Sequence, residues 1–232
     1  MLRKPSPKTT PLRHIAFIMD GNGRWARRRG MPREVGHKAG AKTFRRVVDH
    51  CNKIGIQAVT VYAFSTENWS RPPEEINSIM ELLSDFLTEA YDRPDDEVEI
   101  RFIGDKSVFQ LPLRARLEQL ELRTTGRKSR LNIALNYGSK AEIVQAVNTA
   151  VKDGKSELSE EDISDALYTA GCPDPDMIVR TGGDIRLSNF LLWQGAYAEL
   201  YFTDTLWPDF TPRHVDKAVK EYYRRHRRYG GL

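Results

Sequence analysis

The segment FIMDGNGRWARRRG, residues 17–30, joins an apolar run to a glycine turn and then to a cluster of arginines. An apolar run that ends in such a turn is typical of a parallel strand whose backbone N–H groups bind a phosphate. Asp20, directly before the glycines, would repel that phosphate unless a cation lay between them. The segment therefore predicts a parallel sheet and raises the question of what neutralises Asp20.

Strand-like runs alternate with helix-like periods along the rest of the chain, which favours βαβ units. Six strands are predicted, beginning at His14, Ile56, Val98, Arg130, Asp176 and Ala198. A helix between the first two strands has Phe44, Val47, Val48 and Cys51 on one face and stops at Gly55. Further helices are predicted near 113–122 and 141–151, from a capping box at Ser159, and over 211–225 with Pro212 at its first position.

A longer amphipathic helix is predicted after Pro72 and Pro73, with a broad apolar face that runs from Ile76 to Ala90. This face either packs in the core or lines an apolar tunnel between the helix and the sheet. The fold class predicted is α/β, a single domain with a central six-stranded, mostly parallel sheet flanked by helices and a hydrophobic tunnel between them.

Composition restricts the class of protein. The 232 residues, 40% of them hydrophobic, suit one core, which we place at 13–232 after a flexible tail at 1–12. Cys51 and Cys172 can support neither a disulfide framework nor a thiolate metal site. No signal peptide or membrane-spanning run is recognisable, so a soluble, cytoplasmic protein is expected. A net charge of +4 does not require nucleic-acid binding.

Polar clusters follow three of the predicted strands: DGNGRW the first, STENWSR the second and RTGGDIRLSN the fifth. Ligands of open parallel sheets bind beyond the carboxyl ends of the strands, so these segments are expected to converge. Arginine is the side chain suited to bidentate phosphate contacts. The pattern predicts a site for a small anionic substrate.

Two common nucleotide sites are excluded. Residues 21–26 fit G-x-G-x-x-A, but Gly30 and Pro32 interrupt the helix that a dinucleotide site needs. Such a site also needs an acidic residue about 20 positions further on, at the end of the second strand, and Glu67 lies far beyond that distance. No G-x-x-x-x-G-K-[ST] motif is present either. Asp20 is explained by Mg²⁺, which takes one or two carboxylates and bridges to substrate oxygens. Glu199, in AYAELYF, is the second candidate ligand, with an ion pair to an arginine as an equal alternative.

The segments HIAFIMDGNGRWA, GHKAGA, YAFSTENWSRP, RTGGDIRLSNFLLWQ and AYAELYFTDTLWPDF closely resemble the cis-prenyltransferases, in particular the bacterial undecaprenyl diphosphate synthases. The resemblance runs from about residue 13 to the C-terminus. It implies Mg²⁺-dependent condensation of isopentenyl diphosphate onto an allylic diphosphate, typically farnesyl diphosphate. The product would be a long-chain polyprenyl diphosphate such as undecaprenyl diphosphate, a lipid-carrier precursor for cell-wall synthesis. It also implies a homodimer, membrane contact through the product and no role for nucleic acid.

The resemblance also assigns site residues. Asp20 is the metal ligand and essential acid, with Glu199 as the second metal-associated acid. The allylic diphosphate is bound by Gly21, Asn22, Gly23, Arg24, Arg33 and His37, with Trp25 beside it. A mobile loop positions the reacting ends through Ser65, Thr66, Glu67, Asn68, Trp69 and Arg71. Isopentenyl diphosphate is bound by Arg180, Arg186, Leu187 and Ser188. Asn68 is given the catalytic role of proton acceptor in this family, but because an amide is a very poor base we expect it to position, with a diphosphate oxygen or Asp20 competing for the proton.

Several alternatives stay open at this point. Arg228-Tyr229-Gly230 either reaches the partner's active site or belongs to a frayed basic tail. Ala63 is expected to line the tunnel, on the strand face that carries Val61 and Ser65, with Tyr62 and Phe64 on the other. A non-catalytic accessory subunit and a nucleic-acid binder are the competing classes of function.

Overall fold

The computed structural model describes residues 11–92 and 97–225. Within these ranges six strands form one sheet in the order β3-β4-β2-β1-β5-β6, and each neighbouring pair is parallel. The strands are β1 (His14–Ile18), β2 (Ala58–Ser65), β3 (Val98–Ile103), β4 (Ser129–Tyr137), β5 (Met177–Arg180) and β6 (Glu199–Phe202). The predicted α/β fold and its six strands are confirmed, and the sheet is parallel throughout.

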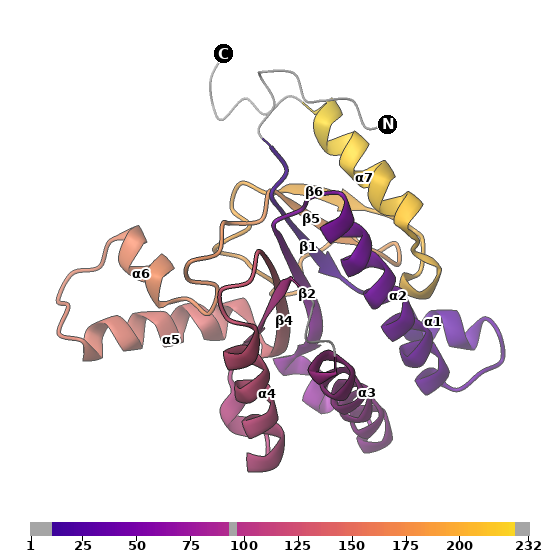
Figure 1. Cartoon of the computed structure of the whole chain (residues 1–232), viewed down its shortest axis with the longest axis horizontal. Helices are drawn as coiled ribbons and strands as arrows, with labels where there is room; N and C mark the ends of the chain where they lie inside the picture. The colour runs from indigo at the N-terminus through magenta and orange to yellow at the C-terminus, as the bar shows by residue number, and fades with distance from the viewer. Residues whose placement is uncertain (1–10, 93–96, 226–232) are drawn as a thin grey trace.

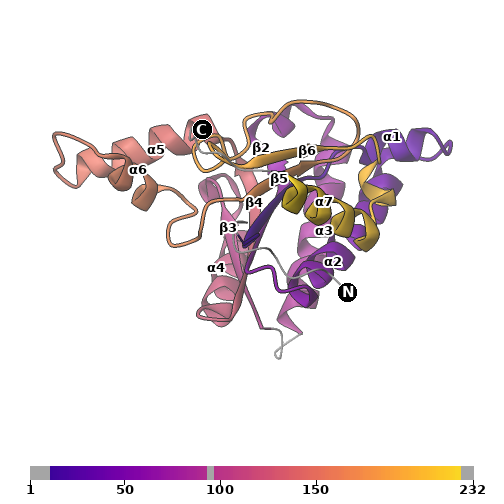
Figure 2. The same cartoon turned by 90° about the horizontal axis from the view of Figure 1, so that it is seen from above.

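Helices cover both faces of this sheet (Figures 1 and 2). One face is covered by α2 (Arg33–Lys53), α3 (Pro73–Tyr91) and α7 (Pro212–Arg224), with α4 (Leu111–Thr124) packed along the edge strand β3. On the other side lie α5 (Ser139–Lys152) and α6 (Glu160–Ala166). The short elements are α1 (Asn22–Arg27) and the 3-10 helices η1 (Thr66–Ser70), η2 (Lys106–Val108) and η3 (Trp207–Asp209).

The predicted local signals account for these helices. In α2, Val47, Val48 and Cys51 are buried against the sheet, and Gly55 follows with a φ of 85°. The capping box of Ser159 and Asp162 is present at the start of α6. Pro212 occupies the first position of α7, where its missing N–H costs nothing. The apolar face of α3 is only partly buried, with Leu83 and Leu87 in the core.

The predicted interruption at Gly30 and Pro32 is confirmed, since α1 ends at Arg27, Gly30 has a φ of 67° and α2 begins only at Arg33. Two other local expectations differ from the structure. Leu12, placed in the tail, is buried, and its N–H bonds the Tyr223 hydroxyl at 3.2 Å. Phe64 does not share a face with Tyr62.

The difference at Phe64 has a structural cause. The register of β2 against β4 shifts between Tyr62 and Ser65, so the strict alternation of side chains is broken there. Phe64 therefore packs in the same core cluster as Val61, whereas Tyr62 packs in the cluster on the other face. Ala63 stays beside the Val61 cluster, as expected.

Two predictions fall outside the described residues: the ending Arg228-Tyr229-Gly230 and the first ten residues of the tail. Over the ranges 11–92 and 97–225, none of the helices has both the length and the apolar composition that crossing a bilayer requires.

Candidate active site

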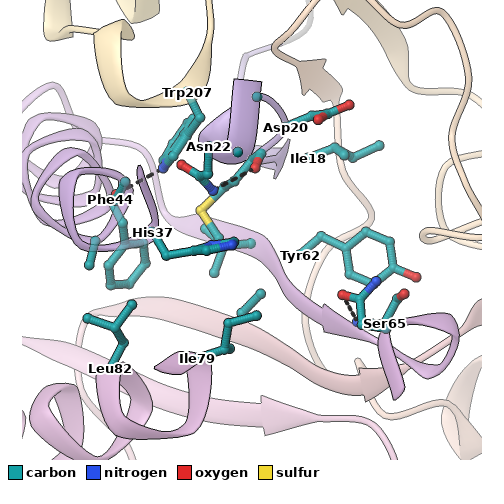
Figure 3. Close-up of a pocket in the computed structure, with 18 of the residues that line it drawn as sticks. Ile18, Asp20, Asn22, His37, Phe44, Tyr62, Ser65, Ile79, Leu82 and Trp207 are labelled. Atoms are coloured by element: carbon teal, nitrogen blue, oxygen red, sulfur yellow. Dashed lines mark hydrogen bonds between the residues drawn. The ribbon is translucent and has the colours of Figure 1, made fainter. Parts of the chain in front are cut away.

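A pocket of about 740 Å³ lies beyond the carboxyl ends of β1, β2 and β5 and extends between the sheet and the helices α2 and α3. Figure 3 shows Asp20 and Asn22 on one side of it and Phe44, Ile79 and Leu82 on the other. Most of the predicted site residues line it: Asp20, Gly21, Asn22, Gly23, Arg24, Arg33, His37, Ser65, Glu67, Asn68, Arg71, Arg180 and Ser188. The three polar segments thus converge on one cavity, as predicted from the sheet.

Asp20 lies at the polar end between two arginines. Its carboxylate contacts Arg24 Nη2 at 2.9 Å and Arg180 Nη2 at 2.9 Å. Burial raises the pKa of Asp20, but the hydrogen bonds and charges of Arg180 and Arg24 lower it more, so the net pKa lies below the usual value. The carboxylate is therefore ionised at neutral pH and held in place from both sides.

Arg180 connects the first and fifth strands. Its Nη1 donates to the Arg186 carbonyl at 2.6 Å and to Ser188 Oγ at 2.7 Å, while Nη2 also reaches Asp184 at 3.3 Å. The side chain is only 5% exposed, and its Nε has no hydrogen-bond partner among the described residues. Because buried polar groups normally find partners, the free Nε is suited to an anionic ligand.

Backbone geometry at Gly21 gives the turn its shape. Gly21 has a φ of 110°, and a Cβ there would lie 3.0 Å from the Leu206 backbone. Only glycine therefore fits between the end of β1 and η3. The turn directs the start of α1, with Asn22 and Gly23, toward the pocket.

A second charged cluster lies across the pocket, around Glu75 of α3. Its carboxylate contacts Arg33 at 2.8 Å, Arg71 at 3.1 Å and His37 Nε2 at 3.3 Å, and its side chain is 8% exposed. Burial raises the pKa of Glu75, but the charges of Arg71 and Arg33 and the contact with His37 lower it more. Burial also lowers the pKa of His37, and Glu75 offsets only part of this. Three groups that can bind phosphate are thus held by one carboxylate.

The loop after β2 forms the short helix η1. Asn68 Oδ1 accepts the Ser65 N–H at 3.1 Å and so caps η1. Glu67 Oε1 accepts from Asn189 Nδ2 at 3.2 Å, which ties this loop to the segment after β5. Because the amide oxygen of Asn68 is occupied by a backbone N–H, its geometry favours positioning over proton transfer.

The far end of the pocket is apolar. It is lined by Phe44 and Ala41 of α2, by Ile79, Met80, Leu82, Leu83 and Phe86 of α3, and by Val61, Ala63, Ile133 and Leu135 of the sheet. Phe44 and Phe86 meet edge to face at 5.7 Å between ring centroids. One cavity therefore joins a cationic end to an apolar end.

Some predicted site residues do not line the pocket. Trp25 donates to Asp209 at 2.7 Å and stacks under Arg29, outside the cavity. Trp69 donates to Asn136 Oδ1 at 2.8 Å. Arg186 is 62% exposed and pairs with Asp184 at 2.8 Å. Thr66 and Leu187 are also absent from the lining.

Glu199 lies apart from the residues that line the pocket. It lies beside Met177 at the start of β6, three positions before the residue that pairs with Arg180, and so at the other end of the strand from Asp20. Its carboxylate accepts from Arg225 Nη1 at 2.8 Å. Within one chain Glu199 therefore lies away from Asp20 and makes the ion pair to an arginine that was the alternative interpretation, while its role at a metal stays a prediction.

Sequence reasoning missed two acids of the site. Asp184 contacts Arg180, Arg186 and, at 3.8 Å, Arg24. Glu75 had one local signal, its i,i+4 spacing from Arg71, whereas its contacts with Arg33 and His37 join residues 42 and 38 positions apart. Asp184 stands in the turn after β5, where no helical spacing predicts its contact with Arg180.

The carboxylates near Asp20 fit a metal shared with substrate, not a protein-only metal site. Among the described residues no three His, Cys, Asp or Glu side chains cluster as metal ligands. Asp20 and Asp184 nevertheless contact the same two arginines, Arg24 and Arg180, which line the pocket together with Asp20. Mg²⁺ needs only one or two carboxylates when substrate phosphates complete its coordination, so this donor set suits it.

Comparison with known proteins agrees with this site. A family model described as "Putative undecaprenyl diphosphate synthase" matches residues 18–230. The chain belongs to this family of prenyltransferases. An isoprenyl transferase of Fusobacterium nucleatum is 49% identical over 222 residues, covering 95% of this chain and 96% of that protein. An isoprenyl transferase of Wolinella succinogenes is 49% identical over 223 residues, covering 95% and 97%.

Solved structures of the family have the same fold. A probable undecaprenyl diphosphate synthase from Campylobacter jejuni superposes with a TM-score of 0.82 at 35% identity, covering 96% of this chain and 100% of that one. Lavandulyl diphosphate synthase from Lavandula x intermedia, in complex with dimethylallyl diphosphate, gives 0.88 at 30% identity, covering 94% and 98%. The chain is therefore a prenyltransferase enzyme.

Proposed function

We propose that this prenyltransferase condenses isopentenyl diphosphate units onto an allylic diphosphate, such as farnesyl diphosphate, with cis geometry. The product would be a long-chain polyprenyl diphosphate such as undecaprenyl diphosphate, a precursor of the lipid carrier for cell-wall synthesis. The observation that carries the proposal is the single cavity that joins a cationic end to an apolar end. An allylic diphosphate has this same division between a polyanionic head and a hydrocarbon tail.

The two diphosphates would occupy neighbouring parts of the polar end. The glycine turn, Arg24, Arg33 and His37 would bind the allylic diphosphate, and the complex of the lavandulyl enzyme with dimethylallyl diphosphate supports a site of this kind. Arg180, with its free Nε, and Ser188 would bind isopentenyl diphosphate. Arg186 would join them from the exposed rim.

This arrangement suits ionisation of an allylic diphosphate. Charge builds up on the leaving diphosphate, and the guanidinium of Arg24 and the N–H groups at the start of α1 are placed to stabilise it. Mg²⁺, held by Asp20 with Asp184 nearby, would supply further charge neutralisation. The apolar walls keep water from the allylic carbon. Asn68 would shape the loop near the reacting ends through its bond to Ser65.

The proposal extends to the setting of the enzyme. We propose a homodimer in the cytoplasm that contacts the inner face of the membrane through its product and does not bind nucleic acid. We also propose that the apolar end of the cavity continues as the tunnel for the growing chain, because α3 presents Ile79, Met80 and Phe86 to it.

The test is direct. Incubating the protein with farnesyl diphosphate, labelled isopentenyl diphosphate and Mg²⁺ should give a ladder of longer prenyl diphosphates, sized by chromatography. Chelation of the metal should stop the reaction. Binding of farnesyl diphosphate without any elongation would contradict the proposal and restore the accessory-subunit interpretation.

A further inference from the structure

The loop from Ser188 to Leu191, which carries part of the polar end of the site, has an unusual backbone. Ser188, Asn189 and Leu191 all have positive φ, at 49°, 61° and 46°. Such conformations cost about 1–3 kcal/mol each for residues other than glycine and persist only where the surroundings enforce them. Something outside the loop must therefore hold it.

The first support is the start of α5. The Asn189 carbonyl accepts the Ser139 N–H at 2.8 Å, and Asn189 Oδ1 accepts the Lys140 N–H at 2.9 Å. In return Ser139 Oγ accepts the Leu192 N–H at 2.9 Å. The contact is close, because a Cβ on Gly138 would lie 2.7 Å from Asn189 Nδ2. The loop thus provides the N-terminal cap of α5 across 50 residues of sequence.

The second support is a buried carboxylate in the first turn of α5. Glu142 is 1% exposed, and among the described residues no basic side chain pairs with it. It accepts instead from the Tyr137 hydroxyl at 2.5 Å, from Gln194 Nε2 at 3.1 Å and from the Tyr168 N–H at 3.0 Å. A carboxylate can accept from all three donors at once. A glutamine could not, because its NH2 group would point its own hydrogens at one of these donors.

These donors lie on both sides of the loop. Gln194 follows it in the chain, while the ring of Tyr137 packs edge to face on Phe190, inside it, at 6.1 Å. Phe190 also stacks on Tyr62 at 4.5 Å, and the Tyr62 hydroxyl donates to the Tyr137 carbonyl at 3.1 Å. The unit built on Glu142 therefore fixes Phe190 from one side and the end of the loop from the other.

The loop in turn places groups of the site. Ser188 Oγ accepts from Arg180 Nη1 at 2.7 Å, and Asn189 Nδ2 donates to Glu67 at 3.2 Å. Burial raises the pKa of Glu142, and the hydrogen bonds from Tyr137, Gln194 and Tyr168 offset only part of this. A buried acid without a cationic partner is unfavourable for stability, so its place here calls for a role beyond packing.

We infer that Glu142 is a positioning residue, which acts through Tyr137 and Gln194 to hold the Ser188–Leu191 loop in the shape that binds isopentenyl diphosphate. The inference rests on the proposed function only for the identity of that substrate. Glu142 touches no substrate itself, because it lies behind the loop and does not line the pocket.

The kinetic test uses Glu142→Gln in the full chain. The KM for isopentenyl diphosphate should rise about tenfold, because the variant loses hydrogen bonds to a charged group. The KM for farnesyl diphosphate should stay within about twofold of the wild-type value. The matched control is Thr124→Val, which removes an equally buried hydrogen bond, from the Ile100 N–H, on the far side of the sheet. It should lower stability without changing either KM. Unchanged KM values in Glu142→Gln, or an equal rise in both, would overturn the inference.

A second variant and a second readout guard against misfolding. Tyr137→Phe removes one hydroxyl and should raise the same KM about threefold. Hydrogen exchange of a peptide covering residues 187–194 should speed up in both variants and not in Thr124→Val, with no reaction needed for the measurement. If the wild-type protein made no prenyl product but this exchange changed, the proposed function would fail and the positioning role would stand. Exchange that matches the wild type in both variants would overturn it.

Discussion

The two ends of the parallel sheet both contain buried polar side chains, but they pair differently. At the amino end, His14 donates from Nδ1 to the Pro173 carbonyl at 2.6 Å, and its Nε2 lies 2.7 Å from the Thr60 hydroxyl. Asn132 donates to the same hydroxyl at 3.0 Å, and Asp176 accepts the N–H groups of Arg13 and His14. These groups satisfy one another.

At the carboxyl end the pairing is incomplete. Asp20 and Asp184 share the guanidinium groups of Arg24 and Arg180, and Arg180 Nε and Asn22 Oδ1 stay without partners among the described residues. A polar network that is complete stabilises a fold, whereas one that is incomplete and lines a cavity is ready for a ligand. The difference separates residues that hold the sheet together from residues that act at its edge.

The largest contrast should come from one aspartate at each end. Asp20→Ala should lower turnover by at least about 10³-fold while the protein stays folded, because it removes the charge that organises the polar end. Asp176→Ala should instead lower the free energy of unfolding by about 2–5 kcal/mol, since two backbone N–H groups lose their acceptor, with turnover per folded molecule kept. Steady-state product formation and urea unfolding measure both. Near-normal activity of Asp20→Ala at saturating Mg²⁺ would break the contrast.

The stability of the protein should depend on pH through His14, which belongs to the complete network at the amino end of the sheet. Burial lowers the pKa of His14 from 6.5 to about 4. The unfolded chain therefore binds a proton that the folded chain does not, so stability is full above pH 6.5 and falls as the pH drops toward 4. The loss from this group is about 3 kcal/mol. Urea unfolding at pH 7 and pH 4.5 should show this loss of unfolding free energy in the wild type and not in His14→Gln. An identical change in unfolding free energy between the two pH values in both proteins would refute the assignment.

The arginines of the carboxyl end should affect one substrate. Arg180→Ala and Arg186→Ala should each raise the KM for isopentenyl diphosphate, because each variant loses a charge-assisted contact worth about 1.5–3 kcal/mol. The effect of Arg180→Ala should lie at the upper limit of this range because Arg180 is buried, and the effect of Arg186→Ala at the lower limit because Arg186 is exposed. Arg130→Ala, near the amino end of β4, is the control with no effect on KM. If only the KM for farnesyl diphosphate rose, the two diphosphate sites would be exchanged.

The smallest effect on rate should come with a change of product. Ala63 lines the pocket, and a leucine there should introduce strain of about 1–3 kcal/mol once the growing tail reaches it. Ala63→Leu should keep the first condensations within about twofold of the wild-type rate and shorten the final chains. Ala58→Leu, at the amino end of the same strand and outside the pocket, should leave the chain length alone. An unchanged product distribution from a folded, active Ala63→Leu protein would remove Ala63 from the tunnel.

Local sequence rules predicted the parts of the site that local structure determines. The apolar runs defined the strands, and the polar segments after them had to meet because parallel strands end at one edge. Asp20, Arg24 and Arg180 were found in this way. The ends of most strands were placed within two residues, because glycine, proline and capping signals stand next to them.

The features that were missed depend on register and on distant contacts. Glu199 stands at the start of the predicted strand 198–202, so the rule that parallel strands end at one edge already places it at the amino end, away from Asp20; its assignment to the metal came from the resemblance and not from that rule. Phe64 was misplaced by an irregularity in β2 that no residue type announces. Glu75 and Glu142 escaped notice because most of their partners lie on other elements.

The strand order has a consequence for how the protein is made. Asp20 and Arg180 are 160 residues apart, and β1 has β5 as a neighbour. At synthesis rates of about 5–20 residues per second, roughly 8–30 s pass between the emergence of the two residues from the ribosome. During this time Ile15 and Phe17 of β1 lack the strand that completes their side of the sheet. The nascent chain therefore has an open strand edge until β5 arrives, and the first catalytic turnover reports that the last quarter of the chain, from β5 onward, has folded.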